Sequence, residues 1–330
     1  MATLAEIRAK LLAAEKTKGG NATGGNRDNS VFPHWNIPDN STVTVRFLED
    51  GDATNDYFWR ERLMIKIPFT GVKGHDESKQ VIVQVPCIEM WGKECPVHRE
   101  IRPWFKDPTM EDMARKYWKK RSYLFQGLIV DSPLVEDDAP ANPIRRFTIS
   151  PSIYKTISGA LMDPDFGDYL PTDIENGTDF RITKTQKGQY ADYSTSGWAR
   201  KERGLDQAER DIIAEHGLHN LNDYMPKEPN AEELNAIFEM FEASVEGELY
   251  DPERFADYYR PWGLDKPNTG STQTAEPAPS TPAAETKAST PVEDAPIASA
   301  PAPVEKPAAS EGTKDAKDIL AAIRARKETN

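Results

Sequence analysis

Cysteine is scarce in this chain, and long apolar segments are missing. The 330 residues include two cysteines, Cys87 and Cys95, which excludes a disulfide-stabilised secreted fold. No apolar stretch approaches the roughly 20 residues that a membrane-spanning helix needs. The segment Met1 to Lys10 also lacks the apolar run of a signal peptide. These absences predict a soluble intracellular protein without a membrane partner.

The known catalytic signatures are also missing. The chain has no Walker phosphate loop, no His-Glu-x-x-His, no nucleophile elbow and no dinucleotide-binding glycine fingerprint. Acidic groups such as Asp50 and Asp52 are chemically able to hold Mg²⁺, but they fall in predicted turns, where solvated carboxylates are common. We therefore expect no enzymatic activity. The enzymatic alternative, a metal-dependent nuclease, predicts strand cleavage with added Mg²⁺ or Mn²⁺.

An excess of positive charge is lacking too, since the net charge is -13. The acidity is unevenly distributed: residues 1–204 contain 29 basic and 29 acidic side chains, whereas residues 205–270 contain 5 and 16. Within the neutral part, Arg115 to Arg121 puts five basic residues into seven positions. Such a local concentration of cations can attract phosphates even on a neutral body.

Alternating apolar residues dominate the chain from Val31 to about Gly204. Short segments of this kind, separated by Gly, Pro, Asn and Asp, predict strands of an antiparallel sheet that is closed or nearly closed into a barrel. The predicted strands cover residues 43–47, 64–69, 81–85, 123–130, 145–149 and 179–185. The sequence therefore predicts a mainly β fold of the α+β class for a core at 31–204.

Helical periodicity appears outside these strands. It predicts helices at 152–161, 206–216 and 231–245, the last two within an acidic helical region at 205–266. The Pro/Ala-rich segment 267–313 cannot bury enough apolar surface to fold, so we expect a disordered linker. Short amphipathic helices are expected at both ends, in an arm at 1–30 and in a tip at 314–330 that suits a protein contact.

Basic and aromatic residues alternate just before the fourth predicted strand. Cations neutralise phosphates, while stacking of a base on an aromatic ring contributes on the order of 1 to 3 kcal/mol whatever the base. This alternation therefore favours single-strand binding, and its simpler interpretation is a solvated helix end with packed aromatics. The residues concerned are Arg115, Lys116, Trp118, Lys119, Lys120, Arg121 and Tyr123, followed downstream by Arg145, Arg146, Phe147, Lys187, Tyr190 and Tyr193.

The two cysteines lie close to a histidine, in the pattern Cys87-x7-Cys95-Pro-Val-His98. Thiolates and imidazole at such spacing suit a structural tetrahedral zinc site. A fourth ligand is needed, and His75 is the nearest histidine before Cys87. However, a simple hairpin over residues 63–84 would place His75 at its tip, far from Cys87. The alternative is two buried cysteines and a surface histidine without metal.

Several of these features occur in a fixed order along the chain. Trp35 leads into Val45-Arg46-Phe47-Leu48, the Cys-Pro-Val-His knuckle follows, and Lys119-Lys120-Arg121-Ser122-Tyr123 precedes an apolar strand. A strand and helix at 145–161 and the pair Tyr190 and Tyr193 come next. In this order the chain resembles the family of T-even-type phage single-stranded DNA-binding proteins, also called helix-destabilising proteins, over roughly Trp35 to Trp198.

The resemblance implies a five-stranded, OB-fold-like barrel with a small zinc-binding subdomain, here at 60–120. By position it implies that Arg46, Lys119, Lys120 and Tyr123 line a DNA cleft, with Phe147, Tyr190 and Tyr193 contacting bases. Cys87, Cys95 and His98 fall on metal-ligand positions for one Zn²⁺. The family's other histidine ligand maps to residues 62–68, which contain no histidine.

The resemblance also implies a biological role. It implies cooperative, sequence-nonspecific coating of single-stranded DNA in phage replication, recombination and repair, in the cytoplasm of the infected host. The arm would contact the neighbouring subunit through Leu4, Ile7, Arg8, Lys10 and Leu11. Replication proteins such as a helicase loader, a polymerase and a recombinase would be recruited by an acidic C-terminal region, although here the acidity precedes the linker. The alternative is a phage structural or scaffolding protein.

Overall fold

The computed structural model describes residues 29–136 and 139–264. The arm contacts expected at Leu4, Ile7, Arg8, Lys10 and Leu11 lie outside the described residues. The same is true of the linker at 267–313 and the tip at 314–330. None of the helices within the described part is long and apolar enough to cross a bilayer.

Eight strands form one antiparallel sheet in the described part of the chain. Their order is β3-β2-β4-β1-β6-β7, with β5 paired to β4 and β8 paired to β6. The predicted α+β class and the six predicted strands are confirmed. The strands are β1 (Ser41–Leu48), β2 (Trp59–Phe69), β3 (Val81–Pro86), β4 (Lys120–Asp131), β5 (Arg145–Ile149), β6 (Thr178–Lys187), β7 (Tyr190–Asp192) and β8 (Gly197–Glu202).

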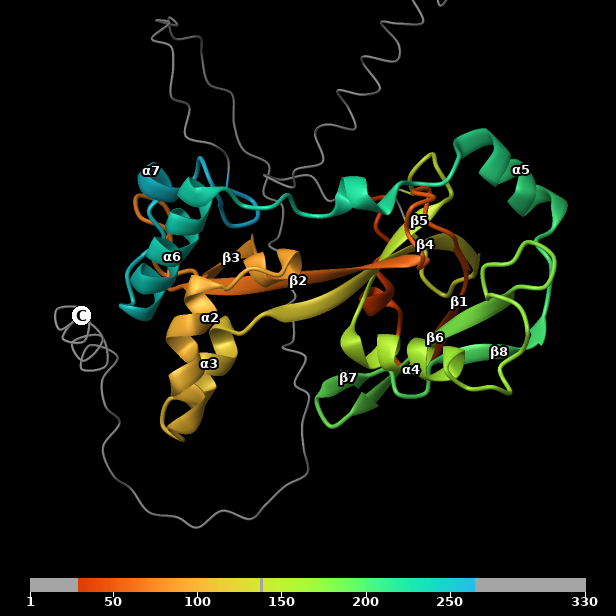
Figure 1. Cartoon of the computed structure of the whole chain (residues 1–330), viewed down its shortest axis with the longest axis horizontal. Helices are drawn as coiled ribbons and strands as arrows, with labels where there is room; N and C mark the ends of the chain where they lie inside the picture. The colour runs from red at the N-terminus through yellow and green to blue at the C-terminus, as the bar shows by residue number, and fades with distance from the viewer. Residues whose placement is uncertain (1–28, 137–138, 265–330) are drawn as a thin grey trace, which may run out of the picture.

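Strand β4 organises the sheet because three strands pair with it. β1 and β2 follow each other along β4: Leu48 pairs with Gln126, and Trp59 pairs with Phe125. β2 then continues past the start of β4 and pairs with β3 over Met64 to Phe69. In Figure 1, β2 therefore runs between two bodies. One contains β3 with α2 (Pro96–Ile101), α3 (Glu111–Tyr117), α6 (Ala231–Val245) and α7 (Pro252–Phe255), and the other contains β1, β5, β6 and β8.

The prediction of a five-stranded closed barrel is wrong, because the sheet is open. Among the described strands, β3 and β7 at the two ends of the order pair with one neighbour each. Helix α4 (Pro151–Leu161) contacts both β4 and β8, which no strand pairing connects. Its buried Ile153 and Ile157 join the apolar core there. A helix thus covers apolar side chains that a closed barrel would cover by strand pairing.

Six α-helices and four 3₁₀ turns complete the described part. Helices α5 and α6 begin with capping boxes, Asp206 with Glu209 and Asn230 with Glu233, which satisfy the free N–H groups of a first turn. The helices are α2 (Pro96–Ile101), α3 (Glu111–Tyr117), α4, α5 (Gln207–His216), α6 (Ala231–Val245) and α7 (Pro252–Phe255), and the turns are η1 (His34–Asn36), η2 (Ile88–Trp91), η3 (Arg102–Lys106) and η4 (Leu221–Tyr224).

Two large apolar cores lie at the two ends of β2. The first, here called the β3 core, joins Ile65 and Ile67 of β2 to Trp104 of η3 and to Met240 and Phe241 of α6. The second, the β1 core, surrounds Phe47 and includes side chains of β4, β5, β6 and α4. Helices α6 and α7 of the acidic region therefore belong to the same core as β2 and β3.

Candidate metal centre and nucleic-acid interface

Cys87, Cys95 and His98 form a compact buried group. Cys87 follows β3, Cys95 caps the N-terminus of α2, and His98 lies within α2. Their exposed fractions are 0%, 2% and 0%. One ligand atom from each lies within 4.8 Å of the others, and both cysteines are free thiols. Cys95 and His98 are close because both lie at the first turn of α2. Cys87 is brought to them by the end of the β2–β3 hairpin.

The backbone around the two sulfurs stabilises negative charge on them. A hydrogen bond from Cys87, together with the backbone N–H groups of His98 and Val97, lowers the pKa of Cys95 against the opposing effect of burial. Donation to Cys95 and burial raise the pKa of Cys87, while the N–H of Glu89 acts in the opposite direction. Cys95 is therefore the readier of the two to ligate, because the thiolate is the form that ligates metals, whereas Cys87 has to lose its proton when an ion binds.

His98 is held on both of its ring nitrogens. Its Nδ1 lies 3.7 Å from Cys87 Sγ and 3.0 Å from Glu89 Oε1, and its Nε2 accepts the backbone N–H of Lys119 at 3.1 Å. The ring stacks on Trp118 at 4.6 Å between centroids. Burial lowers the pKa of His98, with Glu89 opposing. The imidazole is therefore neutral near pH 7, as a metal ligand must be.

These three residues can hold a metal ion, and their chemistry fits zinc: two sulfurs, one imidazole and a buried site. The structure does not bring His75 into the group. Phe69 pairs with Val81 near the tip of the hairpin, whereas Met64 pairs with Pro86 at its base, next to Cys87. Five residues of a strand span about 17 Å. Exposed His75 lies beyond the tip, so the expectation that it is a ligand is not supported.

The basic and aromatic segment connects α3 to β4. Arg115 and Lys116 end the helix, and Lys120 and Arg121 begin the strand; all four are exposed. Arg115 pairs with Glu111, Lys119 with Glu89, and Arg121 with Glu61 at 2.9 Å. Burial and the neighbouring Lys66 and Arg115 lower the pKa of Lys120. The segment therefore presents cations whose intramolecular partners are mostly surface carboxylates.

Four of the predicted DNA contacts are internal in this structure. Arg46 has no exposed surface and pairs with Asp179 at 2.8 Å. Arg145 is 3% exposed and pairs with Glu136 at 2.7 Å. Arg146 lies 3.6 Å from the ring centroid of Tyr224, and Phe147 is fully buried in the β1 core. Arg46 therefore does not line an open cleft in this structure, and Arg145, Arg146 and Phe147 are not exposed as DNA contacts.

The predicted aromatic contacts have mixed environments. Tyr123 is 4% exposed and stacks on Tyr154 with ring centroids 3.5 Å apart. Trp118 is half-buried against His98, and Tyr193 is half-buried near His34; burial raises the pKa of Tyr193 to about 12. Lys187 and Tyr190 are exposed on the β6–β7 hairpin, with Tyr190 at 52%. Only this last pair is as accessible as the sequence suggested.

A row of aromatic rings that sequence reasoning missed lies on the bend before β2, on β2 itself, on β4 and on α4. Tyr57 is 4.9 Å from Trp59, and Trp59 is 5.5 Å from Tyr154, which stacks on Tyr123. Tyr57 is 59% exposed at the end of the row. The run Tyr57-Phe58-Trp59 was the available signal. Tyr123 and Arg121 of β4 share one face by strand alternation, so this row lies beside a cation.

Arg62 is a second residue that the sequence did not single out. It lies on β2 opposite Ser122 of β4. Its side chain is partly exposed, and the burial of the rest lowers its pKa; no carboxylate among the described residues pairs with it. Within the described residues its side chain bonds to Ser122 Oγ at 3.3 Å. A desolvated guanidinium without a counter-ion is an unfavourable arrangement that a bound anion relieves.

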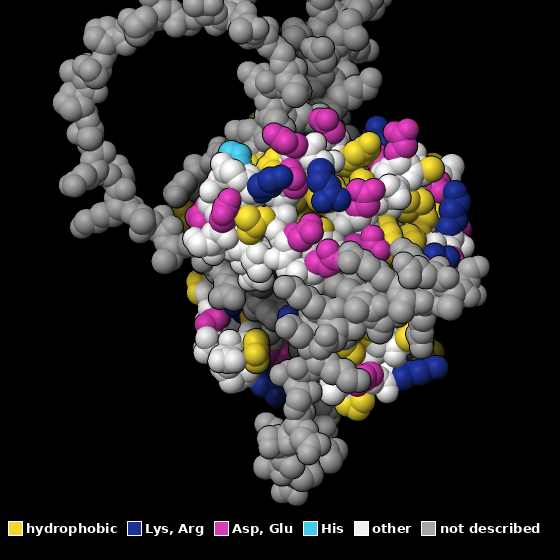
Figure 2. Space-filling model, turned by 90° about the vertical axis from the view of Figure 1, so that its left-hand side faces the viewer, with side chains coloured by type: hydrophobic (Ala, Val, Ile, Leu, Met, Phe, Trp, Pro, Cys, Tyr) yellow, Lys and Arg dark blue, Asp and Glu magenta, His cyan; other side chains and the backbone are white. Residues whose placement is uncertain are grey.

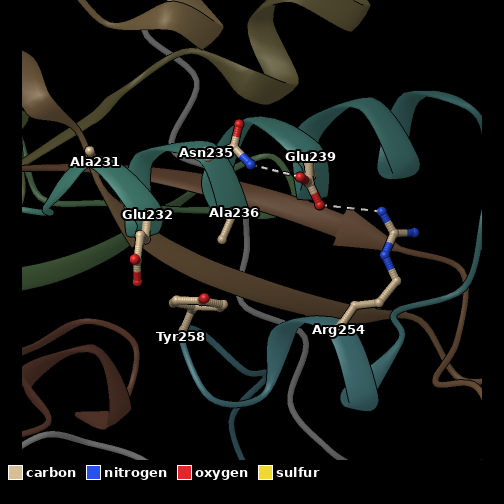
Figure 3. A pocket seen from close by; sticks show the side chains of 7 residues that line it. All are labelled: Ala231, Glu232, Asn235, Ala236, Glu239, Arg254 and Tyr258. Carbon is tan, nitrogen blue, oxygen red and sulfur yellow. Dashed lines mark hydrogen bonds and ion pairs between the residues drawn. The ribbon is translucent and has the colours of Figure 1, made fainter.

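The acidic end of the molecule differs from the β2–β4 ribbon, the paired part of these two strands that carries Trp59, Arg62 and Tyr123. A hollow of about 480 Å³ between α6 and α7 is lined by Glu232, Glu239, Asn235, Arg254 and Tyr258, with Ala231 and Ala236 (Figure 3). Glu239 accepts from Asn235 at 2.7 Å and pairs with Arg254 at 3.4 Å. The face at this end carries acidic side chains scattered among basic ones (Figure 2). Neither feature suits a phosphate backbone.

The Cys87, Cys95 and His98 group and the β2–β4 ribbon are thus neighbouring features of one region. Lys119 joins them, since its N–H binds His98 and the next residue begins β4. A comparison with known proteins adds no family to this geometry: no protein-family model matches the chain, and none of the curated proteins is similar enough to it to be a relative.

Proposed function

We propose that this protein binds single-stranded DNA with little sequence preference and has no catalytic role. The observation that carries the proposal is the exposed ring of Tyr57, supported by the packed rings of Trp59, Tyr154 and Tyr123 and lying beside the cations of the α3–β4 segment. Aromatic faces accept any base, and cations neutralise phosphates. A duplex hides its base faces, so this combination favours the single strand.

The proposed mechanism is passive. A protein that binds only the open form of a duplex stabilises that form by mass action, and thereby destabilises the duplex. The family resemblance supports a role in phage replication, recombination and repair, with cooperative self-association and recruitment of replication proteins. Those partner contacts are proposed from the sequence of residues outside the described part.

The test is a titration of the full chain with poly(dT) and with duplex DNA, followed by tryptophan fluorescence. Trp59 and Trp118 lie in the proposed interface, so binding changes their emission. We expect tight binding to poly(dT), much weaker binding to duplex, and a logarithm of affinity that falls steeply with the logarithm of salt concentration. Equal or absent binding to the two DNAs would contradict the proposal and favour a scaffolding role.

We also propose that the ion held by Cys87, Cys95 and His98 is zinc. Zinc in a closed, buried site supplies a cross-link, here between the end of β3 and helix α2, and contributes directly to folding. We expect one zinc per chain by elemental analysis and a lower melting temperature after chelation. Cys95→Ser should lose the metal, whereas unchanged zinc content in that variant would contradict the assignment.

A further inference from the structure

The carboxylate of Glu89 lies next to the buried Cys87, Cys95 and His98 group. Glu89 follows Cys87 by two residues, in turn η2. Its Oε1 is 3.0 Å from His98 Nδ1, and its side chain is 14% exposed. A tetrahedral ion held by two sulfurs and one imidazole lacks one ligand. We propose that Glu89 supplies it, an inference that rests on the metal site proposed above.

The separations measured from His98 Nδ1 agree with a shared ion. With ordinary zinc bond lengths, two ligand atoms of a tetrahedral site lie about 3.3 Å apart for nitrogen and oxygen and about 3.6 Å apart for sulfur and nitrogen. The structure has 3.0 Å from Glu89 Oε1 to His98 Nδ1 and 3.7 Å from Cys87 Sγ to His98 Nδ1. Around Nδ1 the two atoms are therefore spaced as neighbouring ligands would be. The ligand atoms that all lie within 4.8 Å of one another come from Cys87, Cys95 and His98, without Glu89, so the Glu89 carboxylate has to turn toward the sulfurs when the ion binds.

The charges around the group also fit a carboxylate ligand. Two thiolates and a carboxylate exceed the charge of a divalent ion by one negative unit. Two cations flank Glu89: Lys119 Nζ pairs with its Oε2, and Arg102 Nη2 lies 3.2 Å from its Oε1. They can offset that excess at the edge of a buried site, where an uncompensated charge is costly.

One present contact must be exchanged when a metal binds. A neutral imidazole that ligates through Nδ1 carries its proton on Nε2, yet Nε2 here accepts the N–H of Lys119. The Lys119 amide therefore has to leave the ring. Since Lys119 is held by Glu89 and His98 together, ligation by these two residues loosens the beginning of the proposed DNA-binding segment.

The competing interpretation is that Glu89 only forms ion pairs with His98 and Lys119. Titration of the metal-free full chain with Co²⁺ and then Zn²⁺ separates the two, because the Co²⁺ spectrum reports the ligands directly. We compare the natural chain with Glu89→Gln and, as a matched control, Glu94→Gln. Glu94 is exposed and lies 3.8 Å from Arg102, so it shares the charge environment without reaching the sulfurs.

We expect the natural chain and Glu94→Gln to bind one Co²⁺ with a four-coordinate spectrum. Glu89→Gln should bind at least about tenfold more weakly, with an altered visible band. Glu89→Cys serves as a second variant: a third thiolate should preserve tight binding and increase the thiolate-to-cobalt charge-transfer absorption by about half.

Three results would overturn the inference in distinguishable ways. No Co²⁺ or Zn²⁺ binding by the natural chain removes the metal site and Glu89 with it. Tight metal binding with identical affinity and spectrum in Glu89→Gln removes Glu89 alone and leaves a site of three protein ligands. A Glu89→Cys variant whose charge-transfer absorption equals that of the natural chain also shows that position 89 is not a ligand.

Discussion

At the scale of single residues, His34 shows how burial sets a charge state. It is fully enclosed in turn η1 next to Trp35 and Tyr193, and its Nδ1 has no hydrogen-bond partner. Burial lowers the pKa of His34 from 6.5 to about 4, partly offset by a hydrogen bond to Phe32. The folded protein therefore keeps this imidazole neutral at pH values where an unfolded chain protonates it.

This difference predicts a loss of stability in mild acid. Between pH 6.5 and about 4 the unfolded state binds a proton that the folded state does not. As the pH falls through this range, His34 therefore lowers the free energy of unfolding by up to about 3 kcal/mol. Above pH 6.5 the contribution is fully present. Urea unfolding at pH 7 and pH 4.5 should show a smaller pH effect in His34→Gln than in the natural chain. Exposed His216→Gln is the control and should keep the full effect.

Arg62 gives a second prediction at this scale. Its guanidinium is partly desolvated and has no carboxylate partner in the described part of the chain. Replacement by Gln should lower the affinity for poly(dT) by about tenfold and reduce the salt slope by about one, without lowering stability. Arg60 is the matched control, because it pairs with Asp50 and Asp52. Arg60→Gln should affect stability more than DNA binding; the reverse pattern would exclude Arg62 as a phosphate contact.

At the scale of elements, the β2–β4 pair combines the row of rings with the cations. Tyr57, at the exposed end of the row, should stack on a base. Tyr57→Ala is expected to weaken poly(dT) binding by about 1 to 3 kcal/mol while leaving the salt slope unchanged. Tyr258→Ala is the control, since this residue is 41% exposed but lies in the hollow at the acidic end (Figure 3). Equal losses in both variants would contradict a specific role for the row.

Helix α6 is acidic on its exposed side, but its other side is buried in the β3 core. Phe241 is 2% exposed and contacts Tyr117 at 5.0 Å and Trp104 at 5.9 Å between ring centroids. Phe241→Ala should lower the free energy of unfolding by about 3 to 5 kcal/mol, because it leaves a cavity in the β3 core. Urea unfolding measures this loss. Exposed Glu232→Ala on the same helix should change stability by less than about 1 kcal/mol.

At the scale of the whole molecule, the fold consists of two bodies, and the acidic region runs between them. The two cores at the ends of β2 are bridged by the β2–β4 ribbon, and the segment from α5 through η4 to α6 returns from one body to the other (Figure 1). Turn η4 contacts both β2 and β4. The acidic region is thus built into both bodies, which explains how a chain of net charge -13 can keep a cationic segment in its middle.

The secondary structure was largely predictable from the sequence. Residues 145–149 and 231–245 were predicted as a strand and a helix, and β5 and α6 have these same bounds. Alternation and helical periodicity are local patterns, and each element here follows its own pattern. The grouping of Cys87, Cys95 and His98 was predictable for the same reason, since a tight turn and a hairpin end bring them together within 12 residues.

Tertiary structure alone decided the rest. Whether Arg46 faces DNA or Asp179 depends on a partner 133 positions away, and no local pattern contains that choice. The open sheet is a matter of which strands pair, with α4 contacting both β4 and β8, and the aromatic row follows from the pairing of β2 with β4. The sequence by itself determined most of the longer elements and the three residues that could hold a metal ion. Only folding decided which charged groups are neutralised inside the protein, because a buried cation takes the nearest anion in space, however distant it is in the chain.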